Sequence, residues 1–332
     1  KISFQGSNTH SGNTVLLGGG EVEFTNNNSF GTSRLVLGSR NSIGVTLSPL
    51  RTTTLSNVLR IRSDSAVNVA SGNSFTYTGS ASVSSNAQLT KQGAGTFILA
   101  HSANTRTGAT TISSGTLQIN NGNVGSGAIN LGTATLATNF GGGAVSLSNA
   151  MPVSDSSSPT ISVATNDRLT LTGLISGNGE LTKDGGGTLV LNNTSNSVNA
   201  MNISGGTVSV NNDSLGGSDI NISNNATLQV SVATLFNGIN FSTGGGTILY
   251  NDFAEFTRSF SGSGVITNSG AGVIFAATSN NTGGLSVVSG GIIARGVGGV
   301  TSGPITMAGG KLYYFNATTH AVNIVIVLYI KP

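Results

Sequence analysis

The chain has 332 residues, of which 14 are lysine or arginine and 11 are aspartate or glutamate, and its formal net charge is +3. Charged residues make up only 8% of the chain, so the cations are too sparse to neutralise a run of phosphates and we expect no nucleic-acid partner. Cysteine is absent, which excludes a fold held by disulfides. Because charged residues are so few, the surface must be rich in hydroxyl and amide groups.

A long repeat runs through the chain. One half of its unit occurs at residues 8–24 and again at 104–119. The other half reads LTKQGAGTFIL at 89–99 and LTKDGGGTLVL at 181–191, which agree at seven of eleven positions, and a weaker copy spans 265–276. Because repeats of this kind build solenoids, in which each coil contacts only its neighbours, we expect one elongated domain over residues 1–332. Its super-repeats would cover approximately 1–88, 89–180, 181–264 and 265–332.

A shorter period of 19 or 20 residues lies inside the long one. One five-residue pattern recurs at 187–191, 206–210, 226–230 and 246–250. It consists of a small residue, a threonine, an apolar residue, any residue and a second apolar residue. This alternation is typical of a strand with one buried face, which so short a strand can bury only by stacking on its copies. We therefore expect two buried columns, Leu189, Val208, Leu228 and Ile248 in one and Leu191, Val210, Val230 and Tyr250 in the other.

Turn residues surround these strands. The 49 glycines and only 5 prolines suit many tight corners without loss of backbone donors, and no long stretch has the apolar period of a helix. We predict an all-β fold, a right-handed parallel β-helix (β-solenoid) of roughly 16 coils of about 20 residues each.

The two ends of the chain lead to separate expectations. Residue 1 is a lysine that no signal peptide precedes, so we expect a mature or excised segment. Residues 321–330 form the most apolar stretch, which is too short to span a bilayer as a helix. We expect a final strand or pair of strands there. The alternative is an assembly edge that pairs with another chain through Val322, Ile324, Ile326, Leu328 and Ile330.

Groups that could carry chemistry are few. The closest carboxylate pairs are Glu21 with Glu23 on one strand, Glu180 with Asp184 at a repeat motif, and Asp252 with Glu255 in an expected loop. None has an obvious partner one coil away, as glycoside hydrolysis would need. The three histidines show no metal-ligand spacing, and no Gly-rich run opens a helix that could cradle a phosphate. We therefore expect no catalytic, cofactor-binding or metal-binding residues and no enzymatic activity.

The segment LTLTGLISGNGELTKDGGGTLVL at 169–191, together with LTKQGAGTFIL at 89–99, resembles the autotransporter-associated β-strand repeat. That repeat occurs in passenger domains of type V secreted proteins and related surface proteins of Gram-negative-type bacteria. The resemblance implies a parallel β-helix displayed outside the cell, often as an adhesin or a structural surface protein, and brings no catalytic residues with it. Because this sequence shows no ten-residue amphipathic strands of an outer-membrane barrel after its repeats, we expect a passenger fragment, or a subunit of something that does not use its own barrel.

Three functions remain as hypotheses. The first is a non-enzymatic extracellular rod of adhesin or matrix type, which contacts a host or neighbouring cell surface, glycans or matrix without inserting into a membrane. The second is a subunit of a filament or sheath assembled end to end through the strand edges of the terminal coils. The third is a polysaccharide lyase or hydrolase on a β-helix scaffold.

Overall fold

The structure is a computed structural model of the chain. It describes residues 1–39, 43–80, 86–101, 103–211, 215, 217, 219–275, 279–295, 301–315 and 324–325. None of these residues is helical, and the strands pair in parallel. The predicted class, an all-β parallel β-solenoid, is therefore confirmed. Contacts group the residues into two compact units, Lys1–Asp167 and Arg168–Pro332, which we describe separately. The single domain with four super-repeats stays a prediction.

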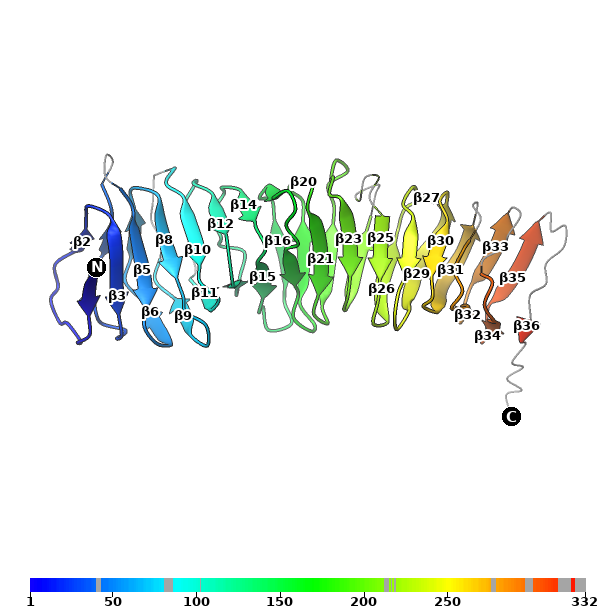
Figure 1. The fold of residues 1–332 in the computed structure, drawn as a ribbon, viewed down its shortest axis with the longest axis horizontal. Helices are drawn as coiled ribbons and strands as arrows, with labels where there is room; N and C mark the ends of the chain where they lie inside the picture. The colour runs from blue at the N-terminus through cyan, green and yellow to red at the C-terminus, as the bar shows by residue number, and fades with distance from the viewer. Residues whose placement is uncertain are drawn as a thin grey trace. The chain divides into compact units, whose positions relative to one another are not determined.

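The first unit is built from three series of stacked parallel strands (Figure 1). The first series is β1 (Ile2–Phe4), β3 (Gly20–Phe24), β5 (Val45–Pro49), β8 (Ser65–Asn68), β10 (Leu89–Gln92), β12 (Thr110–Ile112), β14 (Ile129–Leu131) and β17 (Met151–Val153). The second is β6 (Thr53–Leu55), β9 (Ser74–Tyr77), β11 (Thr96–Leu99), β13 (Thr116–Ile119), β15 (Thr135–Thr138) and β18 (Thr160–Ser162). The third is β2 (Thr14–Leu16), β4 (Leu35–Leu37) and β7 (Leu59–Ile61), and β16 (Ala144–Leu147) follows β15 in the chain.

The second unit is also built from stacked parallel strands, which form two long series. One is β21 (Glu180–Asp184), β23 (Ala200–Ile203), β25 (Asp219–Ile222), β28 (Ile239–Phe241) and β30 (Phe260–Gly262). The other is β19 (Arg168–Leu171), β22 (Thr188–Leu191), β24 (Thr207–Val210), β26 (Ala226–Val230), β29 (Gly246–Phe256), β31 (Ile266–Phe275), β32 (Leu285–Val287), β34 (Ile305–Met307) and β36 (Ile324–Val325). Beside it, β27 (Thr234–Leu235) pairs with β29, β33 (Gly291–Arg295) with β31 and β35 (Lys311–Phe315) with β33, and β20 (Ile175–Gly177) precedes β21.

The predicted core columns lie in register in the second unit. Leu189 pairs with Val208, Val208 with Leu228, and Leu228 with Ile248, and the column from Leu191 to Tyr250 follows the same register. All eight side chains are at most 1% exposed. The threonines that precede them, Thr188 to Thr247, pair in a parallel half-buried column on the opposite face. One face of each strand is thus dry, and the other carries hydroxyl groups.

The solenoid has about 14 turns, fewer than the 16 predicted, because several turns are longer than the repeat period. In the first unit Gly20 pairs with Val45 and Thr135 with Thr160, steps of 25 residues each. Strand β29 also differs from expectation, since it continues through Asp252 and Glu255, where a loop was predicted. Its register against β31 shifts between Tyr250 and Phe253, and its second part pairs with β27.

Candidate functional site

A column of asparagine side chains runs along the outer face of the second unit. Asn202 on β23, Asn221 on β25 and Asn240 on β28 are register partners and are half-buried. The Asn221 amide donates to the Asn202 carbonyl oxygen at 2.7 Å, and the Asn240 amide donates to that of Asn221 at 3.3 Å. Their strand neighbours on the opposite face, such as Ile220 and Ile222, are fully buried. The apolar face therefore fixes the strands, and the outer face presents a row of oriented amides.

A groove of about 390 Å³ lies beside this column. Asp219 on β25 and Gly238 next to β28 stand one coil apart, because Ile220 pairs with Ile239. A Cβ atom on Gly238 would lie 2.8 Å from Asp219 Oδ1, so the missing side chain leaves the floor of the groove open for the carboxylate. Arg258 reaches the other side, with its Nη1 4.0 Å from Asp219 Oδ1. The groove is also lined by Asn221, Asn240, Ser259 and Ser261.

The groove offers both hydrogen-bond donors and acceptors. Asparagine amides carry both, the Asp219 carboxylate only accepts, and the Arg258 guanidinium only donates. Asp219 and Arg258 are both more than half exposed, so their ion pair is weak and open to a competing ligand. Such a set of groups fits a ligand rich in hydroxyls, which itself donates and accepts. The volume lies at the lower end of the range for small-molecule sites, roughly 300–1,000 Å³.

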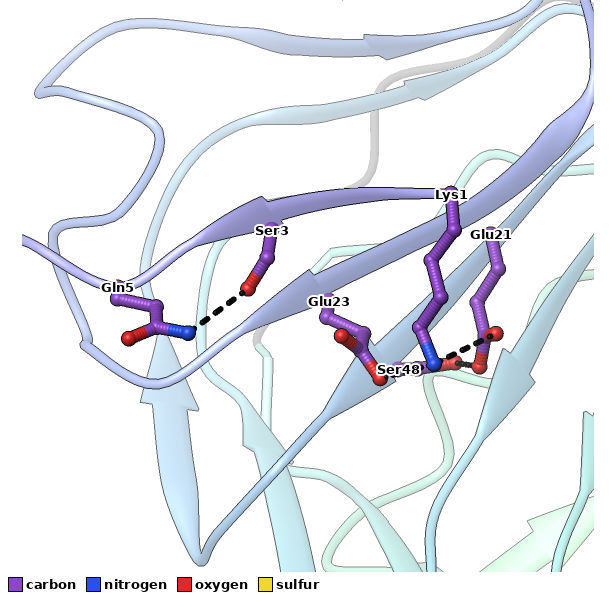
Figure 2. Close-up of polar contacts among 6 residues, drawn as sticks. All are labelled: Lys1, Ser3, Gln5, Glu21, Glu23 and Ser48. Atoms are coloured by element: carbon purple, nitrogen blue, oxygen red, sulfur yellow. Dashed lines mark hydrogen bonds and ion pairs between the residues drawn. The ribbon is translucent and has the colours of Figure 1, made fainter.

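The first predicted carboxylate pair lies on the outer face of β3 in the first unit. Lys1 Nζ lies between the two carboxylates, 2.5 Å from Glu23 Oε1 and 3.5 Å from Glu21 Oε2 (Figure 2). Ser48 on β5 donates its hydroxyl to Glu21 Oε1 at 2.7 Å. The hydrogen bond to Glu23 raises the pKa of Lys1, and the bond from Ser48 lowers the pKa of Glu21. Both carboxylates thus bind one ammonium, whereas glycoside hydrolysis uses two carboxylates that face a sugar.

The other carboxylate pairs do not converge within the described residues. Glu180 and Asp184 lie at opposite ends of β21 and are exposed, and each accepts a weak hydrogen bond from a side chain of the next coil. The side chain of Asp252 lies outside the described part of the structure. Asp167, which no sequence pattern singled out, is 2% exposed and accepts bonds from the Thr138 hydroxyl and two backbone amides of residues 140 and 142. Its carboxylate holds a corner of the first unit.

The lysine of the LTK motif has a structural role that the sequence analysis missed. In the second unit Lys183 is fully buried, and its Nζ donates to the carbonyl oxygens of Asp184 at 2.8 Å, Gly185 at 2.8 Å and Gly205 at 2.9 Å. Burial lowers the pKa of Lys183 to about 8, so the amine stays protonated at neutral pH and its three donors match the three acceptors. The ammonium therefore joins two successive corners of the solenoid.

The first unit contains the same arrangement. Lys91 is 1% exposed, and its Nζ donates to the carbonyl oxygens of Gln92, Gly93 and Ser114 at 2.7–3.1 Å. Burial lowers its pKa to about 8 as well. The signal was present in the sequence, because Leu89 and Lys91 stand two residues apart and therefore share a strand face, as Leu181 and Lys183 do.

Three further observations concern the predicted site residues. Of the proposed assembly edge, Val322, Ile326, Leu328 and Ile330 lie outside the described residues, and Ile324 begins β36, where it pairs with Ile305 of β34. Among the described residues, no three His, Asp or Glu side chains lie close enough together to hold a metal ion. The same part of the chain contains no helix with the length and apolar character to span a membrane.

The fold and its nested repeats define a parallel β-solenoid made of recurring corner motifs. Two segments, residues 89–119 and 181–210, match the model of the passenger-associated transport repeat. Each match covers four strands, β10 to β13 in the first unit and β21 to β24 in the second, and includes the buried lysine. The chain thus carries this repeat, and the resemblance to autotransporter passengers that the sequence predicted is confirmed. Neither the curated proteins nor the solved structures gave a match.

Proposed function

We propose that the chain belongs to a secreted or surface-exposed passenger of a Gram-negative-type bacterium and that it acts by contact rather than by catalysis. Two passenger-associated transport repeats support the location. The carboxylates support the mode of action, because Glu21 and Glu23 share one ammonium and Asp167 holds a corner. The outer faces that the structure describes also carry amide and hydroxyl groups, as in the asparagine column and the column from Thr188 to Thr247.

The contact site in this proposal is the groove of Asp219, Asn221, Asn240 and Arg258, and its ligand is a neutral or weakly acidic glycan of a host cell, a neighbouring cell or a matrix. The observation that carries the proposal is the row of oriented amides next to a floor left open at Gly238. A sugar chain presents hydroxyls at regular intervals. A ladder of amides on stacked strands presents hydrogen-bond donors and acceptors at a regular spacing of about 4.8 Å. One such groove supports only weak binding, with a Kd on the order of 1 mM.

Titration of a panel of soluble oligosaccharides, followed by saturation-transfer NMR, tests this assignment. We expect at least one glycan to bind the unmodified chain and to bind the Asn240→Ala variant about 2–10-fold more weakly, as for one lost hydrogen bond. The matched control is Asn130→Ala. Asn130 on β14 is also a half-buried outward asparagine, and its amide donates to the Thr111 hydroxyl of the neighbouring strand β12. Binding that falls equally in both variants, or no binding at all, would refute the groove as the contact site.

The filament and the polysaccharide-acting enzyme stay predictions. No contact in the described residues favours either over a contact protein.

A further inference from the structure

The first unit contains a small cavity of about 20 Å³. Most of its wall is apolar and includes Leu59 of β7, Phe97 and Leu99 of β11. The remaining wall includes four residues with polar side chains: Tyr77, His101 and Arg106, each at most 2% exposed, and the half-buried Asn104, whose side-chain carbonyl oxygen accepts from the Arg106 backbone amide. A buried cation and a buried imidazole in an apolar wall need partners, because both were hydrated before folding.

Arg106 is a buried cation without a counter-ion among the described residues. Its Nη2 donates to the Thr110 hydroxyl and, at 3.4 Å, to the Gly108 carbonyl oxygen. Its Nε has no hydrogen-bond partner. The ion pairs found in the described chain involve only Lys1 and Arg258, so no carboxylate neutralises this guanidinium there. A desolvated charge in this state destabilises the fold unless something compensates it.

His101 adds a second unpaired group to the same cavity. Neither of its ring nitrogens has a hydrogen-bond partner, although the ring lies 5.3 Å from that of Tyr77. The Tyr77 hydroxyl is already engaged, since its single proton lies within reach of the carbonyl oxygens of Asn57 and Ser80 and its oxygen accepts from the Leu59 amide. Burial, with the charge of Arg106 nearby, lowers the pKa of His101 to about 4. At neutral pH the ring is neutral and offers one N–H donor.

We propose that this cavity binds one small monovalent anion, such as chloride, which accepts hydrogen bonds from Arg106 Nε and from a ring N–H of His101. The cavity holds one particle of about the size of a water molecule. An anion of that size neutralises the guanidinium, which a water molecule cannot do.

The site depends on this copy of the repeat. His10 occupies the position of Arg106 in the earlier copy, and its Nε2 lies 2.8 Å from the Thr14 hydroxyl oxygen, just as Arg106 contacts Thr110 four residues later. His10 is exposed, however, so its polar atoms reach solvent. Of these two copies, the one with arginine places the unpaired group inside the unit.

Thermal unfolding of the unmodified chain in different sodium salts at equal ionic strength tests the proposal. With chloride or bromide we expect the Tm of the first unit to rise by about 3–5 °C for each tenfold increase in anion above its Kd. Gluconate and sulfate, which are too large for the cavity, should give no such rise. Equal Tm values in chloride and gluconate would overturn the proposal.

Two further measurements locate the effect. Arg106→Met should abolish the chloride dependence, whereas the control Arg60→Met, on the outer face of β7, should keep it. A chloride effect that persists in Arg106→Met would overturn the proposal. Crystals of the unmodified chain grown in bromide provide a test that needs no variant to fold. Anomalous density between Arg106 and His101 would support the anion, and a water molecule there without anomalous density would overturn it.

Discussion

The lysine of the repeat motif is the most informative residue to perturb. We predict that Lys183→Met destabilises the corner between β21 and β24 by about 2–5 kcal/mol. Methionine keeps the apolar stem of the lysine but removes the ammonium, so the carbonyl oxygens of Asp184, Gly185 and Gly205 lose their shared donor.

The magnitude follows from two opposing terms. Three charge-assisted hydrogen bonds together contribute about 5–9 kcal/mol, at about 1.5–3 kcal/mol each. Burying the ammonium costs about 3 kcal/mol, which corresponds to the lowering of the Lys183 pKa from 10.5 to about 8. The difference, reduced slightly by the better burial of methionine, gives the predicted loss.

Hydrogen exchange is the suitable assay, because a solenoid opens locally and its global unfolding is not a single step. The amides of Ser204 and Thr207 report on this corner, since they donate to the carbonyl oxygens of Lys183 and Gly187. We expect both to exchange about 30-fold to 3,000-fold faster in Lys183→Met. The control Lys311→Met removes an exposed lysine of the same unit and should leave them unchanged. Unaltered exchange in Lys183→Met would refute the role of the ammonium.

Three more predictions follow from the described contacts. The pKa of His101 is about 4 in the folded chain and about 6.5 in the unfolded chain, so the unfolded chain binds the proton more tightly. The free energy of unfolding should therefore fall by up to about 3 kcal/mol between pH 6.5 and pH 4 in chloride-free buffer. His101→Phe should flatten that slope in pH-dependent denaturant titrations, and an unchanged slope would contradict the assignment. Gly206→Ala should lower the free energy of unfolding by more than about 2 kcal/mol, because φ is +61° and the new Cβ would lie 2.4 Å from the carbonyl oxygens of Gly185 and Gly187. The control Gly12→Ala, with open space around it, should be nearly neutral in urea unfolding. If the chain assembles end to end, sedimentation at rising concentration should give a growing series of oligomers, and a single species throughout would exclude assembly.

The repeat period carried most of the fold prediction. The small-Thr-apolar pattern places Leu189, Val208 and Leu228 in one buried column, and the structure has them in that register. The number of turns was less accessible. Extra residues at a corner, as between Gly20 and Val45, lengthen a turn without altering the alternation of the strands that flank it.

Local features that depend on three-dimensional packing were predicted less well. The burial of Lys183 was not predicted, although its spacing from Leu181 already assigned it to the inner face. Asp252 was expected in a loop, but β29 continues there because β27 supplies a second pairing partner. The groove at Gly238 and the burial of Arg106 arise from how loops and neighbouring coils meet, which no alternation pattern records.

We propose above all that the outer faces of this solenoid bind and do not catalyse. Incubation of the purified chain with polysaccharides from bacterial surfaces and from animal matrix, with retention and product formation measured in the same samples, tests it most directly. We predict retention of at least one polysaccharide, weakened by Asn240→Ala, with no change in its length or in its reducing or unsaturated ends. Turnover that disappears when Glu21, Glu23 or Asp219 is replaced by its amide would contradict it.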